Sequence, residues 1–274
     1  MPSLAVIGHP VAHSRSPDMQ TAALAELGLA GEWTYGALDV APADFEATVA
    51  ELAAAEDYAG VNVTVPHKAA ALAMADEKSA AAAAIGAANT LSFRDGRIVA
   101  DNTDAGGLLR ALPGSVRGRR ALVLGAGGAA RAAIWALARG GAVIDVDLEP
   151  VPVHVWNRTK ERAERVAAEL GGNPEQAPRQ SAYGLIVNAT TVGLRGEDPF
   201  ELLPLDRRSF DPEQVVVDMV YTEAPSALLG AAAAAGATVV DGLEMLVQQG
   251  ALSLRIWTGE EPSLEAMRTA VRRG

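Results

Sequence analysis

The sequence of 274 residues predicts an α/β fold with two domains. Short β-branched runs alternate with segments rich in Ala, Leu and Glu, which is typical of a mostly parallel sheet covered by helices. The pattern occurs twice, once in the first hundred residues and again from Ala121 to about Val240. The length also suits two modest domains.

The first block predicts alternating strands and helices that end in a hairpin. Strands are expected at 4–7, 33–40 and 61–64, helices at 17–27, 43–54 and 68–78, and hairpin strands at 90–93 and 97–101, joined by a turn at 94–96. The second block predicts strands at 121–124, 151–156, 185–188, 215–219 and 238–240. The tail from 242 to 273 is expected to be helical, with a break at 257–259 and a new helix start at 262–264.

Composition excludes several classes of function. Acidic residues outnumber basic ones, 34 to 23, for a formal charge of −11, and this surface repels phosphate backbones and anionic lipids. We therefore expect no nucleic-acid and no membrane partner. The absence of cysteine excludes disulfides and thiol nucleophiles, and the four histidines lack metal-ligand spacing, so no metal is assigned. The first ten residues lack the regions of a signal peptide, which favours a cytoplasmic protein.

The strongest single motif follows the strand that begins at Ala121. The strand leads directly into a glycine-rich loop and then a helix, in the order Gly125-Ala126-Gly127-Gly128-Ala129-Ala130-Arg131. Gly125 permits a tight turn, and Gly127 has no Cβ to obstruct a pyrophosphate placed at the helix N-terminus. A glycine-rich structural turn is the alternative, but the strand and helix around the loop favour dinucleotide binding.

The segment after the next strand favours NADP(H) over NAD. NAD-binding proteins usually place a carboxylate at that strand end, whereas this chain has Asn157, Arg158 and Thr159, followed by Arg162. Guanidinium groups suit the phosphate on the NADP ribose. Two alternatives remain open: the arginines form an ordinary solvated helix face, or the acidic insertion at 145–150 contacts the ribose and favours NAD.

Polar clusters in the first half predict the substrate class. They occupy 8–17, 60–68, 86–90 and 101–107, each just after a strand or between elements, where open α/β sheets bind ligands. The clusters offer hydroxyls and amides with one amine and one carboxylate, which suits a small polyol acid.

Taken together, the motifs resemble the shikimate dehydrogenase family over nearly the whole chain. In family order they are Ser-x-Ser-Pro, Asn-Val-Thr-x-Pro-x-Lys, Gly-Ala-x-Asn-Thr, Asn-Thr-Asp-x-x-Gly, Gly-Ala-Gly-Gly-Ala-x-Arg, Asn-Arg-Thr, Asn-Ala-Thr, Asp-Met-Val-Tyr and Gly-Leu-Glu-Met-Leu-Val-Gln-Gln. The resemblance implies reversible reduction of 3-dehydroshikimate to shikimate with NADPH. It implies a substrate domain at 1–104 plus 242–274 and a Rossmann-type NADP domain at 105–241, in a monomer or a homodimer.

The resemblance also implies residue roles. Lys68 and Asp104 become the catalytic pair, and the chemistry agrees because the alkoxide left by hydride addition must gain a proton. Substrate contacts fall on Ser14, Ser16, Thr64, Asn89, Tyr221 and Gln249. Cofactor contacts fall on Gly125, Ala126, Gly127, Gly128, Ala129, Asn157, Arg158, Thr159, Arg162, Met219 and Gly242. The alternative for the two serines is capping of the helix at Pro17.

Two other functions stay open on the sequence alone. One is a quinate or aminoshikimate dehydrogenase that uses NAD(P). The other is a catalytically silent NADP-binding relative, against which the intact lysine and aspartate argue.

Overall fold

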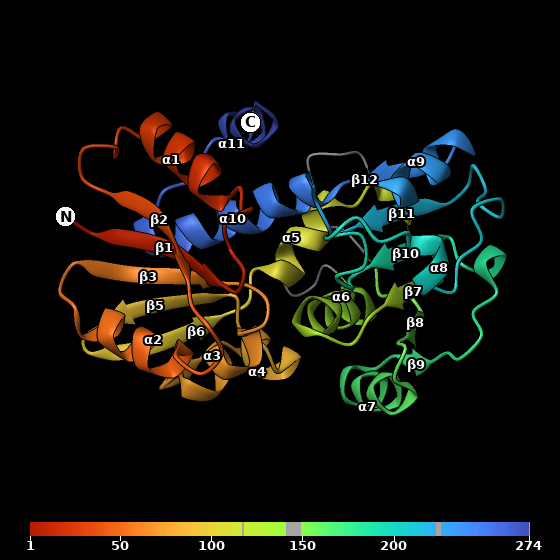
Figure 1. Cartoon of the computed structure of the whole chain (residues 1–274), viewed down its shortest axis with the longest axis horizontal. Helices are drawn as coiled ribbons and strands as arrows, with labels where there is room; N and C mark the ends of the chain where they lie inside the picture. Colours follow the sequence, from red (N-terminus) through yellow and green to blue (C-terminus); the bar gives the residue numbers. More distant parts are fainter. Residues whose placement is uncertain (117, 141–148, 223–225, 274) are drawn as a thin grey trace. The chain divides into compact units, whose positions relative to one another are not determined.

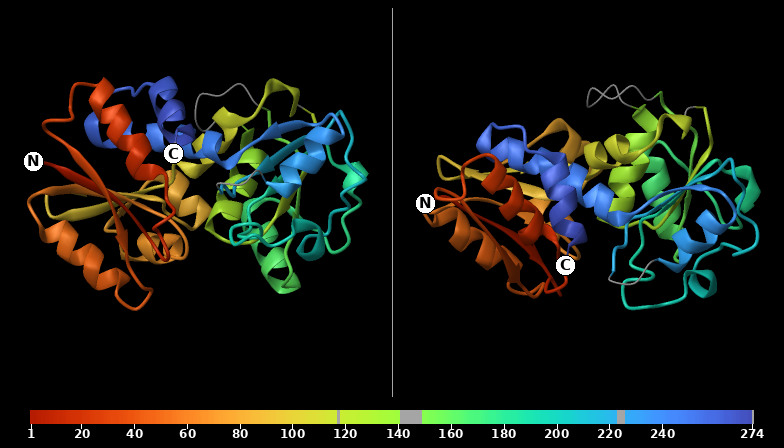
Figure 2. Two further views of the ribbon diagram at one scale, coloured as in Figure 1. Left: turned by 45° about the horizontal axis from the view of Figure 1, so that its top comes forward. Right: turned by 90° about the horizontal axis from the view of Figure 1, so that it is seen from above.

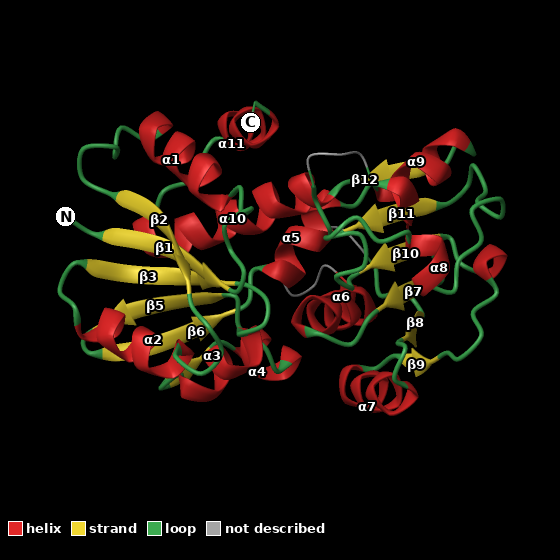
Figure 3. Ribbon diagram, in the orientation of Figure 1, coloured by secondary structure: helices red, strands yellow, loops and turns green. Residues whose placement is uncertain are grey.

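The computed structural model describes residues 1–116, 118–140, 149–222 and 226–273, and divides into two compact units (Figure 1). Unit 1 comprises Met1–Gly107 and Leu246–Gly274, and unit 2 comprises Leu108–Met245. The predicted division placed these boundaries at 104/105 and 241/242. Each unit contains a six-stranded sheet covered by helices, as Figure 3 shows. The α/β class and the largely parallel pairing of the two sheets confirm the predicted fold class.

Unit 1 is built on a mixed sheet with strand order β2-β1-β3-β5-β6-β4. Its elements are β1 (Ser3–Gly8), α1 (Ser16–Glu26), β2 (Thr34–Asp39), α2 (Phe45–Ala54), β3 (Tyr58–Val63), α3 (Lys68–Met74), β4 (Glu77–Lys78), α4 (Ala80–Ile85), β5 (Thr90–Arg94), β6 (Arg97–Asp101) and α11 (Leu264–Arg272). Strand β5 runs antiparallel to β3 and β6, and the other pairs are parallel. Helices α1 and α11 lie side by side in both views of Figure 2.

Both faces of the unit 1 sheet are buried at its central strands β1 and β3. Strand β1 is buried along nearly its whole length, and successive side chains of a strand point to opposite faces. On one face Ala5 and Ile7 pack with Phe45 and Val49 of α2 and Ala71 of α3. This covered sheet gives a rigid support for the loops at its ends.

Unit 2 is built on a parallel sheet with strand order β12-β11-β10-β7-β8-β9. Its elements are the 3₁₀ turn η1 (Gly114–Val116), β7 (Ala121–Leu124), α6 (Gly128–Arg139), β8 (Val153–Trp156), α7 (Lys160–Leu170), β9 (Asn173–Pro174), the 3₁₀ turn η3 (Gln180–Ala182), β10 (Leu185–Asn188), α8 (Pro199–Leu202), β11 (Val215–Asp218), α9 (Ala227–Ala234) and β12 (Thr238–Val240). Helices α5 (Asp104–Ala111) and α10 (Gly242–Thr258) have residues in both units. The order is that of a doubly wound dinucleotide-binding fold, and it reverses between β7 and β10.

The predicted helix at 68–78 is wrong in its second half. Helix α3 ends at Met74, because Ala75 has an extended conformation and Asp76 bonds to the backbone of Ile98 on β6. The short strand β4 and then helix α4 follow, neither of which was predicted. Ser79 caps α4 by accepting from the Ala82 backbone N–H. Tertiary pairing with β6 therefore overrides the helix propensity of this alanine-rich segment.

Within the part of the chain that the structure describes, no helix is long and apolar enough to cross a membrane.

Candidate active site

One end of the unit 1 sheet collects the polar segments that the sequence singles out. The chain leaves β1, β3 and β6 at this end, and antiparallel β5 enters here, so that Thr90 pairs with both Asn62 and Asp101. The loop after β3 leads into Lys68, and the loop after β6 leads into Asp104. Strand direction alone thus brings residues far apart in the sequence to one place.

Lys68 and Asp104 form a close ion pair at this end of the sheet. Lys68 Nζ donates to Asp104 Oδ2 across 2.6 Å. The two side chains are only 14% and 6% exposed, so little water screens the pair. Each residue is the first of its helix, α3 and α5, and the Ala88 backbone N–H donates to the Lys68 carbonyl. The lysine and the carboxylate are therefore anchored through their backbones as well.

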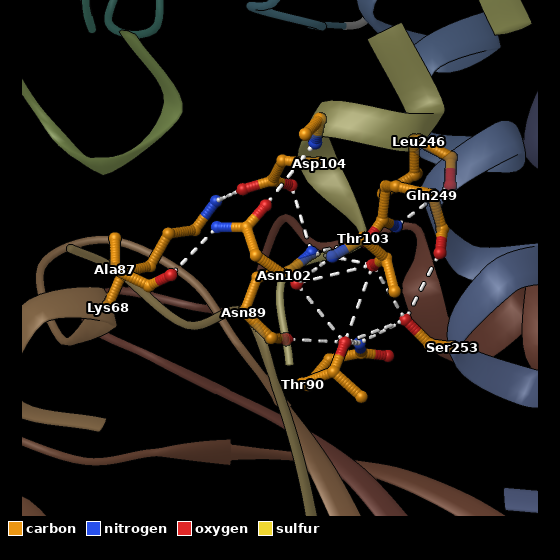
Figure 4. A network of polar contacts seen from close by, with 12 residues as sticks. Lys68, Ala87, Asn89, Thr90, Asn102, Thr103, Asp104, Leu246, Gln249 and Ser253 are labelled. Atoms are coloured by element: carbon orange, nitrogen blue, oxygen red, sulfur yellow. Dashed lines mark hydrogen bonds and ion pairs between the residues drawn. The ribbon is translucent and has the colours of Figure 1, made fainter. Parts of the chain in front are cut away.

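Asn89 joins the ion pair to the rest of the site, as Figure 4 shows. The Thr103 backbone N–H donates to Asn89 Oδ1 at 2.7 Å, which fixes the orientation of the amide because a backbone N–H can only donate. Asn89 Nδ2 consequently faces acceptors, and it donates to Asp104 Oδ1 at 2.9 Å and to Gln249 Oε1 at 3.1 Å. Both carboxylate oxygens of Asp104 thus have donors.

Gln249 of α10 reaches this site because α10 crosses α5 at very short range. A Cβ built at Gly107 would lie 2.7 Å from Gln249 Cβ and 2.8 Å from its backbone nitrogen, so only glycine fits there. Gln249 Nε2 donates to the Leu246 carbonyl, which orients Oε1 toward Asn89 (Figure 4). Both the nitrogen and the oxygen of the Gln249 side-chain amide are therefore hydrogen-bonded.

Of the three predicted hydroxyl ligands of unit 1, Ser14 and Thr64 lie on loops, and Ser16 is the first residue of α1. Ser14 Oγ accepts from the Ser16 backbone N–H at 3.3 Å. Helix α1 has Arg15 as its N-cap, without a side-chain cap bond, so neither serine caps the helix from that position. Among the described residues, the hydroxyls of Ser16 and Thr64 have no hydrogen-bond partner, which leaves both able to bind a ligand.

The remaining predicted contacts, Tyr221, Met219 and Gly242, belong to unit 2. Met219 is half-buried, and its backbone N–H donates to the Asn188 carbonyl. A Cβ at Gly242 would lie 2.8 Å from the carbonyl oxygens of Met219 and Val220. Close packing within unit 2 therefore suffices to explain this glycine without a ligand.

A buried carboxyl tightens the loop that carries Met219 and Tyr221. Asp218 accepts from Asn188 Nδ2 at 2.9 Å, from Ser226 Oγ at 2.5 Å and from the Val220 backbone N–H at 3.1 Å. Burial raises the pKa of Asp218, and these three hydrogen bonds oppose that rise. The sequence motifs contained Asn188 and Asp218, but only the structure shows that they bind one another.

The glycine-rich loop of unit 2 fits a dinucleotide on two observations. Gly125 has φ +119°, and a Cβ there would lie 3.0 Å from the Ala189 carbonyl oxygen, so the backbone itself requires glycine. Gly127 has ordinary dihedral angles, and a Cβ there would meet nothing within 4 Å. Gly127 is the N-cap of α6, and the open space at its Cα leaves room for a ligand to approach the backbone. The half-buried Ala126 and Ala129 flank this open position.

The segment after β8 presents cationic and neutral donors. Arg158 and Arg162 are exposed, and neither guanidinium group has a hydrogen-bond or ion-pair partner in the described ranges. Thr159 is the N-cap of α7 without a side-chain cap bond, and Asn157 Nδ2 donates to the Thr159 carbonyl. Arg158 precedes the helix rather than sharing its face with Arg162. Most of the acidic insertion at 145–150 lies outside the described residues.

The sequence prediction missed four buried polar residues behind the site. Asn62, Thr90, Thr103 and Ser253 are each at most 6% exposed and bond to one another. The first three lie inside motifs that pointed to the site, so their position was available. Ser253 had no such signal, because a serine within a helix is usually an ordinary surface residue.

Comparison with known proteins finds relatives over nearly the whole chain. The family model described as shikimate dehydrogenase substrate binding domain matches residues 6–91, and the model of the shikimate 5′-dehydrogenase C-terminal domain matches residues 242–272. A relative named shikimate dehydrogenase (NADP(+)), from Methanopyrus kandleri, is 42% identical and covers 97% of this chain and 93% of its own.

Solved structures share the whole fold. Shikimate 5-dehydrogenase from Thermus thermophilus, determined in complex with NADP(H) and shikimate, has a TM-score of 0.88 and 42% identity, covering 100% of this chain and 99% of its own. The ligand-free 5-ketofructose reductase of a Gluconobacter species has a TM-score of 0.84 and 29% identity, covering 99% and 98%.

The fold and the two sites define a dinucleotide-dependent oxidoreductase. At this level of identity over nearly the full length, the chain belongs to the shikimate dehydrogenase family.

Proposed function

We propose that the protein catalyses the reversible, NADPH-dependent reduction of 3-dehydroshikimate to shikimate. The observation that carries the proposal is the buried Lys68–Asp104 pair, joined to Asn89 and Gln249 at one end of the unit 1 sheet. The names of the relatives and the Thermus complex with NADP(H) and shikimate support the same substrate and cofactor. Unit 1 then binds the substrate and unit 2 the cofactor.

Lys68 is the proton donor in the direction of reduction. Bound NADPH supplies the hydride that adds to the carbonyl carbon of the substrate. The carbonyl oxygen becomes an alkoxide as the hydride arrives, and it takes a proton from the Lys68 ammonium group, which leaves a neutral amine. Water then returns a proton to the amine. In the oxidation direction, the neutral amine accepts the proton of the substrate hydroxyl.

Asp104 orients the amine and balances its charge. Its Oδ2 holds Lys68 Nζ at 2.6 Å, so the remaining N–H groups of the ammonium point in a restricted set of directions. Its Oδ1 is held by Asn89, which prevents the carboxylate from rotating away. This fixed geometry reduces the reorganisation required when the proton moves.

The substrate's polar groups have matching partners in unit 1. The Ser14 and Ser16 hydroxyls bind its carboxylate without a second buried cation, and Ser16 Oγ and Thr64 Oγ1 have no competing partner among the described residues. Asn89, Gln249 and Thr64 bind the ring hydroxyls, with Tyr221 contributing its phenol.

The residues of unit 2 fit NADPH better than NADH. The loop 125–129 receives the pyrophosphate at the N-terminus of the 12-residue helix α6. Arg158 and Arg162 bind the ribose phosphate, helped by Asn157 and Thr159, since the exposed guanidinium groups are not neutralised by any described carboxylate. Met219 packs on the nicotinamide.

The test is a matched assay of purified protein with two cofactors and several substrates. The oxidation of shikimate, quinate, aminoshikimate and fructose is measured with NADP and with NAD. The absorbance of the reduced nicotinamide gives the rate in each case. We expect the highest kcat/KM for shikimate with NADP. Faster oxidation of quinate or aminoshikimate would identify a different dehydrogenase of this family. Tight NADP binding without turnover of any of them would identify a silent NADP-binding protein.

A further inference from the structure

A cluster of three buried hydroxyls lies directly behind the Lys68–Asp104 pair. Thr90 Oγ1, Thr103 Oγ1 and Ser253 Oγ lie within hydrogen-bond distance of one another, with separations of 2.9, 3.0 and 3.4 Å. Figure 4 shows this hydroxyl cluster beside Asn89. Thr90 and Thr103 come from the two segments that carry Asn89 and Asp104, whereas Ser253 comes from α10. The cluster therefore joins three separate segments of unit 1.

Ser253 is the contribution of α10 to this cluster. Its side chain is fully buried, a position where an unpaired hydroxyl is costly and an apolar residue would be the simpler choice. Ser253 Oγ accepts from Asn62 Nδ2 at 2.9 Å, contacts both threonine hydroxyls, and donates to the carbonyl of Gln249 one turn earlier at 3.1 Å. The hydroxyl thus has partners on β3, β5, the loop before α5 and its own helix.

The partners of Ser253 are the groups that orient the site. The Thr103 backbone N–H donates to Asn89 Oδ1, and Thr103 Oγ1 accepts from Asn89 Nδ2 at 2.9 Å, which leaves the single hydroxyl proton of Thr103 for Ser253 Oγ at 3.0 Å. Thr90 Oγ1 donates to Asn89 Oδ1 at 3.2 Å. The orientation of the Asn89 amide, on which Asp104 depends, is therefore coupled to the hydroxyl cluster.

Ser253 also sets the position of Gln249. The two residues are one helical turn apart on the same face of α10, and Gln249 Oε1 accepts from Asn89. The close contact at Gly107 packs α10 against α5, but packing alone does not fix the orientation of the helix as a hydrogen bond does. Ser253 supplies the hydrogen bonds that hold this face of the helix to the hydroxyl cluster, while Gln20 Nε2 donates to the Gly250 carbonyl on another face.

On this geometry, and on the proposed function, we propose that Ser253 is a positioning residue for the reduction. It touches neither substrate nor cofactor. Its hydroxyl fixes α10 against the hydroxyl cluster, and so keeps the Gln249 and Asn89 amides and the Asp104 carboxylate in register with Lys68. Removal of the hydroxyl leaves Asn62 Nδ2 without its shortest acceptor and frees the two threonine hydroxyls to turn.

The test compares Ser253→Ala with the wild type and with Thr258→Val. Thr258 is the matched control, because it lies on the same helix and donates to the carbonyl four residues earlier. Its other hydrogen bond in the described part of the chain is accepted from the Glu260 backbone N–H, away from the site. We expect Ser253→Ala to lose about tenfold in kcat/KM for shikimate, since small misplacements of oriented groups have large effects on rate. Binding of shikimate alone, measured by calorimetry without cofactor, should weaken, while the KM for NADP stays unchanged. Thr258→Val should leave all three values unchanged.

Two further variants separate positioning from simple stability. Ser253→Thr keeps the hydroxyl and should restore the kinetics of the wild type. Ser253→Cys replaces the hydroxyl by a somewhat larger thiol that hydrogen-bonds weakly, so it should lose activity like the alanine variant even if its melting temperature is normal. Wild-type kinetics in the alanine and cysteine variants would overturn the proposal, as would equal losses for shikimate and NADP. Inactivity of the wild type itself would instead overturn the proposed function.

Discussion

The two candidate ligand sites of this protein are built in opposite ways. In unit 1 the reacting groups are buried and already bonded to one another, as in the Lys68–Asp104–Asn89 chain. In unit 2, Arg158 and Arg162 are exposed without partners among the described residues, and Gly127 faces open space. The first arrangement is preorganised for a chemical step, whereas the second gains its contacts only when an anionic ligand binds.

This difference separates the expected effects of substitution. Changes in the buried site should lower kcat, because they remove or misplace the groups that move the proton. Changes at the exposed site should raise the KM for the cofactor and leave the chemical step intact.

The largest effect is expected for Lys68→Ala. Loss of the proton donor should lower kcat by about 10²–10⁴-fold, the usual contribution of general acid catalysis. The KM for NADPH should stay unchanged, and steady-state kinetics with 3-dehydroshikimate measure both values. Lys78→Ala is the control, because Lys78 is an exposed lysine of unit 1 on β4. A Lys68→Ala enzyme with normal kcat would mean that the ion pair is structural.

A smaller effect is expected when both arginines of unit 2 are replaced. Arg158→Gln with Arg162→Gln should raise the KM for NADPH by about 10–100-fold, from the loss of hydrogen bonds to a charged phosphate. The kcat and KM for NADH should hardly change, so the preference for NADPH over NADH should become smaller. Arg165→Gln tests for a general charge effect, because Arg165 is exposed on the same helix. Equal losses for NADPH and NADH would show that the arginines do not read the ribose phosphate.

The glycine-rich loop offers a contrast within unit 2 itself. Gly125→Ala should lower the free energy of unfolding by about 1–3 kcal/mol, because alanine must adopt a strained positive φ. Gly127→Ala should leave stability unchanged and weaken NADPH binding, because its Cβ points into open space. Urea unfolding and fluorescence titration with NADPH measure the two effects. If Gly127→Ala destabilises the fold as strongly as Gly125→Ala, the ligand explanation for Gly127 fails.

The smallest effect is expected on the pH dependence of stability, from one histidine in each unit whose ring is largely buried. Burial lowers the pKa of both His67 and His154. The hydrogen bond to the Val40 carbonyl partly opposes this lowering at His67, whereas the charge of Arg120 adds to it at His154. Because the unfolded histidines titrate near 6.5, the unfolded chain takes up these protons first as pH falls below about 6.5, and stability declines there.

His67→Gln and His154→Gln should each flatten this decline. Urea unfolding at pH values above and below the histidine range measures the slope for wild type and variants. A slope unchanged in both variants would show that other groups cause the decline.

The sequence predicted most accurately the strands that are buried on both faces of a sheet. The strands at 121–124 and 185–188 are buried at every position and match residue for residue, because continuous apolar runs have few alternatives. The edge strand at 238–240 also matches, although only Val240 is buried there. The predicted helix at 68–78 is longer than the observed α3, because the pairing of β4 with β6 depends on residues about twenty positions away in the sequence. Motif resemblance identified Lys68 and Asp104, but the link through Ser253 depends on packing of α10 that no local pattern encodes.

Chemical rescue of Lys68→Ala tests the central claim most directly. Steady-state reduction of 3-dehydroshikimate by this variant is measured with and without added ammonium or methylammonium. The account predicts very low kcat without the amine and a rise with amine concentration, because a small ammonium ion can replace the missing proton donor. Wild-type turnover without any amine would contradict it.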